Sequence, residues 1–320
     1  MSPQSTGTRI QYHRYGGPEQ MKLEPFSAPT PGKGEVRVQV RAAAVNALDW
    51  KIRNGDMKIM TGRRFPRGLG HDFAGIVDAA GDGVSDYRIG DEVFGTASIK
   101  AAGAFADVIV VPTKLIAKKP VGVSFEQAAA MGIIGMTASQ ALITNGKLSA
   151  GQSVFINGCL GGVGRIATQI AVRQGIKVAG SCRTSRREDA ERLGVSPVVD
   201  FDFDPEGYRG RFDLVFDTAG ALSYTAARTL LKPGGQIIDI NATPAKILRS
   251  AFPGPYRMQF TKTDTDDLTT IADAVQAGKL DLQIARSVPL TAAIDALTEL
   301  ETHNTLKGGK LVITAQPAHA

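Results

Sequence analysis

A glycine-rich turn between two apolar segments constrains the fold of this chain more than any other feature. The segment Val154–Gly164 begins as an apolar run and ends in glycines, and Arg165–Ala171 continues with apolar residues at helical spacing. A strand, turn and helix of this kind brings backbone N–H groups and a positive helix dipole end close to a pyrophosphate. An ordinary glycine-rich turn would show the same local pattern. Together with its surroundings, the turn predicts a dinucleotide site at Gly161, Gly162, Val163 and Gly164.

The next predicted strand, Lys177–Ser181, favours NADPH over NADH as that dinucleotide. At its end, where NAD-binding units place an acidic residue on the ribose 2′-hydroxyl, this chain has Ser181. Arg183 and Arg186 follow it, and guanidinium groups pair bidentately with a phosphate that a carboxylate would repel. The alternative is a solvated helix start, in which Arg186 and Arg187 only pair with Glu188, Asp189 and Glu191.

Length and composition predict a globular protein with two domains. The chain has 320 residues, of which 43% are hydrophobic and 21% charged, enough for two substantial cores. We expect neither a signal peptide nor a membrane-spanning segment, because the required apolar patterns are missing from the sequence. Two cysteines, Cys159 and Cys182, are too few for a disulfide framework and indicate a reducing compartment. A cytoplasmic protein is therefore expected.

The net charge of +6 does not predict a nucleic-acid partner. The 37 basic residues are scattered among 31 acidic ones, without a basic tail or a lysine-rich run. A second local cluster consists of Arg63, Arg64 and Arg67. It is either part of a solvated loop or a rim that attracts an anionic substrate or carrier.

The sequence periodicity changes from that of a β-rich domain to that of a parallel α/β domain. Glu35–Val40 alternates as a half-buried strand does, and closely spaced prolines and glycines punctuate this part of the chain. Helices are predicted from Ser124, which begins a capping pattern, and over Thr137–Asn145. Short strands that alternate with helices then predict a doubly wound parallel sheet: Val154–Asn157, Lys177–Ser181, Val198–Val199, Leu214–Asp217 and Gln236–Ile240.

The last part of the chain returns to mixed structure. Helices are predicted over Asp266–Ala277 and Ala292–His303, and a closing strand over Lys310–Thr314. We expect this strand to rejoin the N-terminal domain. The intervening segment Ala242–Arg257 is poorly patterned, and its Phe252 and Tyr256 are candidates for a substrate-facing surface.

Short motifs along almost the whole chain are similar to those of one family. They are Ala44–Asp49, Gly70–Gly75, Gly90–Gly95, Gly135–Ala138, Gly161–Gly164, Asp217–Gly220 and Gly309–Val312. With them the chain resembles the medium-chain dehydrogenase/reductase superfamily, and within it the zinc-independent quinone oxidoreductase branch that includes alkenal and enone reductases. Cys159 departs from the glycine or alanine that is common in this turn.

The resemblance implies an α/β fold with two domains. A β-rich, GroES-like catalytic domain would comprise residues 1–122 and 263–320, and a Rossmann NADPH-binding domain residues 123–262. By the same resemblance, Thr137 would line the nicotinamide carboxamide, and Thr218 and Asn241 would contribute to the cofactor site. Enzymes of this kind pair the nucleotide-binding sheets of two subunits, so a homodimer is expected, with Gln236–Ile240 or a neighbouring strand near the interface.

The resemblance also speaks against a metal. The catalytic zinc ligands of related alcohol dehydrogenases would fall near Asn46, His71 and Gly132–Ile133, and of these only His71 is a good ligand. The four closely spaced cysteines of their structural zinc site are missing from the sequence. His71 is therefore expected to be a remnant of the zinc pattern, hydrogen-bonded near the pocket.

Three residues are candidates for catalysis. Reduction of an activated alkene needs a hydride, which a nicotinamide supplies, and donors where negative charge develops on the carbonyl oxygen. Lys51 holds a position where alkenal and enone reductases also have lysine and many quinone reductases have tyrosine, and its ammonium would stabilise the enolate. Asn46 would contact the nicotinamide ribose or the substrate, and Asp49 would orient Lys51 or the loop. A solvated lysine and loop-closing Asn46 and Asp49 side chains are the alternatives.

These observations predict an NADPH-dependent, zinc-independent oxidoreductase that acts on a small-molecule quinone or on the activated C=C bond of an α,β-unsaturated carbonyl compound. A first alternative is an enoyl-thioester reductase that acts on a carrier-bound chain, with Arg63, Arg64 and Arg67 binding the carrier or its phosphate. A second alternative is a non-catalytic NADPH-binding protein that acts through protein or RNA contacts.

Overall fold

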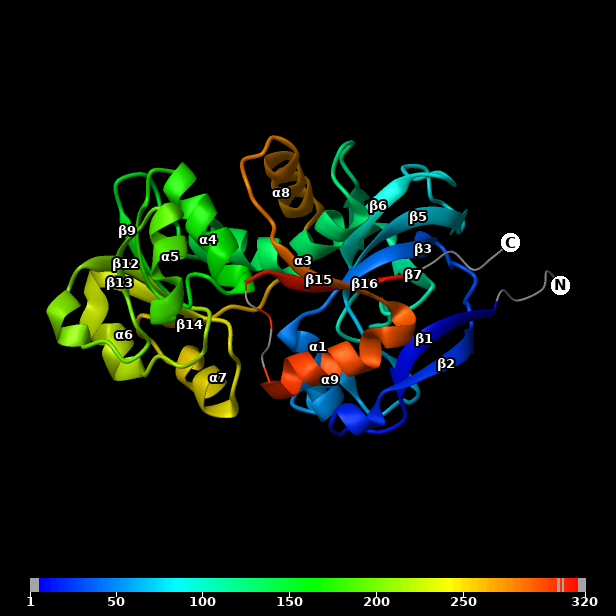
Figure 1. The fold of residues 1–320 in the computed structure, drawn as a ribbon, viewed down its shortest axis with the longest axis horizontal. Coiled ribbons are helices and arrows are strands. Elements are labelled where there is room, and N and C mark those ends of the chain that lie inside the picture. The colour runs from blue at the N-terminus through cyan, green and yellow to red at the C-terminus, as the bar shows by residue number, and fades with distance from the viewer. Residues whose placement is uncertain (1–5, 304–305, 307, 316–320) are drawn as a thin grey trace. The chain divides into compact units, whose positions relative to one another are not determined.

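The structure, a computed structural model, describes residues 6–303, 306 and 308–315. It divides into two compact units, one of residues 1–133 and 263–320 and one of residues 134–262 (Figure 1). The first division falls within helix α3 (Phe125–Ser139). None of the helices in the described ranges is long and apolar enough to cross a membrane.

A seven-stranded sheet forms the centre of the first unit. The strand order is β15-β16-β3-β5-β6-β8, and β7 also pairs with β3. All pairs are antiparallel except the parallel pair of β15 and β16. The strands are β3 (Glu35–Ala44), β5 (Asp72–Ala80), β6 (Glu92–Thr96), β7 (Val108–Pro112), β8 (Ile116–Lys118), β15 (Ile284–Pro289) and β16 (Lys310–Thr314).

Alternation of apolar and polar residues explains how β3 packs. Val36, Val38 and Val40 are buried, whereas the residues between them are partly exposed. The expected strand therefore exists and is longer than predicted. The closing strand β16 pairs with β3, so the end of the described chain returns to the N-terminal unit, as expected.

A smaller sheet and several helices complete this unit. The sheet has the order β2-β1-β4, with strands β1 (Thr6–Tyr12), β2 (Lys22–Ser27) and β4 (Arg67–Gly68). The helices are α1 (Ala47–Asn54), α2 (Lys58–Thr61), α8 (Thr265–Gln276) and α9 (Ala293–His303). Trp50 of α1 is partly buried and packs against the core of this unit.

A six-stranded, all-parallel sheet forms the second unit. Its order is β11-β10-β9-β12-β13-β14, and an α-helix lies in each connection between consecutive strands except that from β11 to β12, which holds only a short 3-10 helix (Figure 1). The strands are β9 (Ser153–Asn157), β10 (Lys177–Ser181), β11 (Val195–Val199), β12 (Phe212–Asp217), β13 (Leu231–Asp239) and β14 (Tyr256–Met258). The helices are α4 (Gly162–Arg173), α5 (Arg187–Arg192), α6 (Tyr224–Leu230) and α7 (Pro244–Ala251). Each predicted strand is present, and Cys159 and Cys182 are buried.

Two local expectations were wrong. The helix predicted over Thr137–Asn145 is not separate, because α3 continues to Ser139 and is followed by a π-helical turn over Gln140–Asn145. The poorly patterned segment contains α7 and β14, and Tyr256 is buried rather than substrate-facing. β13 pairs with β12 on one side and with its neighbour β14 on the other, so β14 is the strand at this edge of the sheet, and a dimer interface near Gln236–Ile240 or a neighbouring strand stays a prediction.

Candidate active site

The glycine turn connects β9 to α4 in the second unit. Gly161 is the N-cap of α4, so the N–H groups of Gly162, Val163 and Gly164 lie in the first helical turn, where no preceding helical carbonyl can accept from them. A Cβ atom on Gly164 would clash with the carbonyl oxygen of Gly158, so this position admits only glycine. The turn therefore presents backbone donors and a helix N-terminus to an anion, as a pyrophosphate site requires.

The side chain of Ser181 is buried beneath the glycine turn and stabilises the backbone of the turn through hydrogen bonds. It is fully buried at the end of β10, and its hydroxyl donates to Asn157 Oδ1 and accepts from the Gly158 N–H at 3.1 Å. Its carbonyl oxygen accepts from the N–H groups of Gly158 and Cys159. The expectation that this hydroxyl contributes to a 2′-phosphate site therefore has no support in its position.

Of the arginines that follow β10, Arg183 is the best placed for a phosphate. Its side chain is exposed and makes no hydrogen bond or ion pair within the described part of the chain. Arg186 instead pairs with Asp189, and Arg187 donates to the carbonyl oxygen of Val198 at 2.7 Å. Arg186 therefore behaves as the alternative interpretation expected, since it pairs with an acidic residue of the helix that follows. The N–H donors of Arg183 remain available for a phosphate.

The other predicted cofactor residues also belong to the second unit. Thr218 follows β12, and its hydroxyl donates to the carbonyl oxygen of Asn157 at 2.7 Å, next to the glycine turn. Asn241 follows β13, and its N–H donates to Asp239 Oδ1 at 2.7 Å. Thr137 of α3 shares a 2.7 Å hydrogen bond with the hydroxyl of Thr261. Thr218 and Asn241 thus lie at the carboxyl edge of the sheet, where open α/β sheets bind ligands.

A buried pair of carboxylates at this edge was not predicted. Asp217 and Asp239 end neighbouring strands in register. Burial raises the pKa of Asp217, and the charge of Asp239 raises it further. Asp239 Oδ2 lies 2.7 Å from Lys246 Nζ and accepts from the Tyr256 hydroxyl at 2.8 Å, and burial raises the pKa of Tyr256. The acidic residues at the ends of two predicted strands were the available sequence signal.

In the first unit, the predicted catalytic residues Asn46 and Asp49 form the start of α1. Asn46 is the N-cap, and its N–H donates to Asp49 Oδ2 at 2.7 Å. Asp49 Oδ1 lies 2.7 Å from His71 Nδ1, and both side chains are 1% exposed. Asp49 therefore closes the loop, which was one of the two interpretations of this residue, and it also holds the His71 ring. His71 is hydrogen-bonded, as expected.

The amide of Asn46 is committed inside the protein. Its Nδ2 donates to Asp72 Oδ2 at 2.8 Å, and its Oδ1 accepts from Lys310 Nζ at 2.6 Å. Asp72 Oδ1 also accepts from the Thr96 hydroxyl at 2.6 Å and from the Ile133 N–H at 3.0 Å. With both ends of the amide engaged, Asn46 is better suited to hold this network together than to bind a ribose.

Burial shifts the pKa values of the two charged residues in this network, Asp72 and Lys310. It raises the pKa of Asp72 and lowers that of Lys310, whereas the mutual attraction of the two charges opposes both shifts. All polar partners of the Asp72 carboxylate are donors and those of Lys310 Nζ are carbonyl oxygens, which favours the charged forms. Neither residue was predicted, although both belong to the motifs that carry the resemblance.

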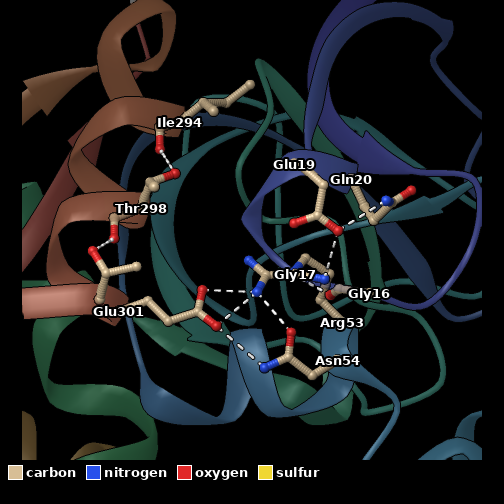
Figure 2. A network of polar contacts seen from close by, with 10 residues as sticks. Gly16, Gly17, Glu19, Gln20, Arg53, Asn54, Ile294, Thr298 and Glu301 are labelled. Carbon is tan, nitrogen blue, oxygen red and sulfur yellow. Dashed lines mark hydrogen bonds and ion pairs between the residues drawn. The ribbon is translucent and has the colours of Figure 1, made fainter.

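Lys51 lies on α1, which is anchored from the opposite side by Arg53. The Arg53 guanidinium is 1% exposed, and its Nη2 donates to both carboxylate oxygens of Glu301 in α9, at 2.8 and 2.7 Å (Figure 2). It also donates to the carbonyl oxygen of Gly16 at 3.1 Å. The side chain of Lys51 is partly buried. The predicted oxyanion donor is therefore carried by a helix that is fixed at both ends.

The second arginine cluster is only partly available to a ligand. The guanidinium of Arg67 donates to the carbonyl oxygen of Thr61 at 2.7 Å and to that of Lys100 at 3.3 Å. Arg63 and Arg64 are exposed. Arg67 therefore stabilises loops of the first unit.

No group of three or more histidine, cysteine, aspartate or glutamate side chains that could hold a metal ion occurs among the described residues. Near the positions discussed for zinc, His71 is a good ligand, Asn46 is a poor one with its amide already hydrogen-bonded, and Gly132 has no side chain. The donor set does not fit a catalytic zinc ion.

Two family models match the chain. The alcohol dehydrogenase GroES-like domain matches residues 32–121, and the zinc-binding dehydrogenase family matches residues 193–313. The quinone oxidoreductase of Lama guanicoe is 30% identical over 97% of this chain and 99% of its own length. The NADPH-dependent alkenal/one oxidoreductase of Arabidopsis thaliana chloroplasts is 30% identical over 96% of this chain and 79% of its own length. The structure of the quinone oxidoreductase from Coxiella burnetii superimposes with a TM-score of 0.90, at 27% identity, over 98% of this chain and all of that one.

The fold and the comparisons define an NAD(P)H-binding oxidoreductase with a GroES-like antiparallel sheet and a Rossmann sheet. The chain belongs to the medium-chain dehydrogenase/reductase superfamily, in the branch of the quinone oxidoreductases and alkenal reductases. The predicted fold class and family are thereby confirmed.

Proposed function

We propose that this protein is an NADPH-dependent, zinc-independent reductase of quinones or of the activated C=C bond of α,β-unsaturated carbonyl compounds. The observation that carries the proposal is the pairing of a glycine turn at the α4 N-terminus with an exposed, uncommitted Arg183 just past β10. The first feature suits a pyrophosphate and the second a 2′-phosphate. The names of the alkenal/one and quinone relatives support the choice of substrate class.

The residues of the second unit would hold the cofactor, and NADPH when bound would supply the hydride. The N–H groups of Gly162, Val163 and Gly164 would bind the pyrophosphate, and Arg183 the 2′-phosphate. Thr137, Thr218 and Asn241 remain candidates for the nicotinamide end. Ser181 and Asn157 act through the turn, because they fix its backbone.

The first unit would supply the electrostatics of the reaction. Negative charge develops on the carbonyl oxygen when the β-carbon accepts a hydride, and a fixed ammonium stabilises this charge at little cost in reorganisation. We assign that role to Lys51. Asn46 and Asp49 cap α1, and Arg53 fixes the same helix to Glu301, so these residues position Lys51 rather than touch substrate.

The direct test is NADPH oxidation in the presence of a small panel of quinones, free enones and enoyl thioesters. We expect turnover of at least one quinone or free enone. Turnover confined to thioesters would instead favour the carrier-bound alternative, with Arg63 and Arg64 as the exposed cations. Tight NADPH binding without turnover of any member of the panel would favour a non-catalytic protein.

We also propose that the protein forms a homodimer through the free edge of β14. The other edge strand, β11, contains Pro197, which lacks the N–H that strand addition needs. The helix α7, which contacts β14, exposes Ile247 and Leu248, and Phe252 just beyond it is also exposed. A second copy would cover both the unpaired backbone groups and this apolar surface.

A further inference from the structure

Lys246 joins the two loops that follow β12 and β13 at the carboxyl edge of the parallel sheet. Its Nζ lies 2.7 Å from Asp239 Oδ2 at the end of β13, and it donates to the carbonyl oxygen of Gly220, in the loop after β12, at 3.2 Å. The side chain of Asp239 is buried and that of Lys246 is largely buried. Because one ammonium group serves acceptors from two different segments, it ties these segments to each other.

The position of Lys246 in α7 is electrostatically unfavourable for a lysine. The residue lies in the first turn of the helix, shortly after the N-cap Thr243. The positive end of the helix dipole repels a cation at this position. The contacts with Asp239 and Gly220 compensate this cost. A residue that breaks a local rule in favour of contacts elsewhere in the fold is typical of a functional site.

The two loops that Lys246 joins touch each other closely. Gly220 has a φ of +72°, and a Cβ atom there would collide with the side chain of Asn241 in the loop after β13. Asp217 Oδ1 accepts from the Gly220 N–H at 2.8 Å, and Asp239 Oδ1 accepts from the Asn241 N–H at 2.7 Å. Burial raises the pKa of Asp217, and the positive charge of Lys246 opposes this shift. Each carboxylate fixes the backbone of its own loop, and Lys246 links the two.

The strand order indicates which half of a dinucleotide these loops would face. The order β11-β10-β9-β12-β13-β14 reverses direction between β9 and β12, and open sheets of this kind bind a dinucleotide across the reversal. The ribose that carries the 2′-phosphate belongs at the end of β10, just before Arg183. The other half of the dinucleotide then extends over the ends of β12 and β13, which is the side of Lys246.

We propose that Lys246 is a positioning residue for the nicotinamide half of the cofactor, an inference that rests on the NADPH binding proposed above. It holds the loops of Thr218 and Asn241 against each other, so these two candidate cofactor residues keep a fixed spacing before the cofactor binds. Loops that are ordered in advance lose little conformational freedom on binding, and the affinity is higher for that reason. Arg183 instead serves the adenosine half, so the two cations act on different halves of one ligand.

The test compares NADPH with adenosine 2′,5′-bisphosphate, which carries the 2′-phosphate but lacks the nicotinamide and its ribose. Lys246→Met removes the ammonium group from the full-length protein. Asp239 retains the Tyr256 hydroxyl and the Asn241 N–H as donors, so this variant should fold. In isothermal titrations, the Kd for NADPH should rise at least tenfold, whereas the Kd for adenosine 2′,5′-bisphosphate should stay the same.

The matched control is Lys232→Met. Lys232 Nζ lies 2.7 Å from Asp213 Oδ2, so this ion pair joins the same two strands, β12 and β13, near their opposite ends. Its loss should leave the affinity for both ligands unchanged. Lys246→Arg, which keeps a cation with several donors, should restore most of the NADPH affinity. If Lys246→Met fails to fold, Lys246→Gln replaces it, since its amide can donate a hydrogen bond but carries no charge.

Two results would overturn the role of Lys246: an unchanged NADPH affinity in the folded variant, or an equal loss of affinity for NADPH and adenosine 2′,5′-bisphosphate. The proposed preference for NADPH can fail separately, because NADH has the same nicotinamide half. In Lys246→Met the Kd for NADH should rise by the same factor as that for NADPH, whichever cofactor the unmodified protein prefers. These titrations need no substrate, so they also decide the role of Lys246 if the proposed turnover of quinones and enones is not found.

Discussion

Ser181 donates a hydrogen bond to Asn157 and thereby joins the ends of β10 and β9 directly beneath the glycine turn. Because Ser181 is fully buried, a carboxylate at this position would have no route to a ribose hydroxyl. Ser181→Asp should therefore destabilise the second unit by about 3 kcal/mol. It should weaken the binding of both NADPH and NADH rather than switch the preference to NADH. Thermal unfolding and cofactor titration test this. A stable variant that prefers NADH would show that the side chain can turn outward.

Arg183 should carry the preference for NADPH. The unmodified protein should bind NADPH at least tenfold more tightly than NADH, a difference of about 1.4 kcal/mol. Arg183→Ala should remove most of this difference by weakening NADPH alone, because only NADPH has the 2′-phosphate. Arg186→Ala should have the smaller effect, since Arg186 already pairs with Asp189.

Isothermal titration with both cofactors measures these preferences. Arg209→Ala is the control, because Arg209 is exposed and pairs with Glu206 away from β10. Equal affinity of the unmodified protein for NADPH and NADH would refute the assignment of the cofactor. A larger loss of NADPH affinity in Arg186→Ala than in Arg183→Ala would assign the main role in binding the 2′-phosphate to Arg186.

The purified protein should contain no stoichiometric zinc, and prolonged chelation should change neither its Tm nor its activity. The reason is the chemistry of the donors: the amide of Asn46 is held by Asp72 and Lys310, which leaves His71 without partner ligands. Elemental analysis of protein purified without added metal decides the question. One zinc ion per chain that is lost together with activity would show that a ligand set had been missed.

Light scattering at micromolar concentration should give twice the mass of one chain. Leu248→Glu, which places a charge on the exposed face of α7, should shift the protein towards the monomer. Ile89→Glu is the control, because Ile89 is also exposed but belongs to the other unit. A monomeric unmodified protein would contradict the expected assembly, and a dimer that Leu248→Glu leaves intact would place the interface elsewhere.

The elements of the fold could be predicted because their signals are local. The alternation in Glu35–Val40 and the glycines before α4 depend only on neighbouring residues, and both predictions hold. The burial of the Ser181 side chain could not be predicted. Which side chains at the end of β10 point into the protein depends on how this strand pairs with β9 and β11. The same applies to Tyr256, which the short edge strand β14 turns towards Asp239.

The network around Asn46 could not be predicted for a different reason. Lys310 and Asn46 lie 264 positions apart and meet only because β16 pairs with the end of β3. Sequence reasoning therefore left Asn46 open between contact with a ligand and closure of the loop, since its partners were unknown. It did anticipate that His71 would be hydrogen-bonded, but the identity of Asp49 as the partner depends on how the chain folds to bring α1 next to the residue that precedes β5.

The central claim is that Lys51 stabilises the oxygen charge during NADPH-dependent reduction, and Lys51→Ala tests it most directly. With the best enone of the panel, kcat and kcat/KM should fall together by about ten- to a thousandfold, because the lost interaction is strongest in the transition state. The affinity for NADPH should change little, and kcat/KM should fall less with quinones than with enones. Lys58→Ala, which removes an exposed lysine of α2, should have no effect. Unaltered enone turnover in Lys51→Ala would contradict the account.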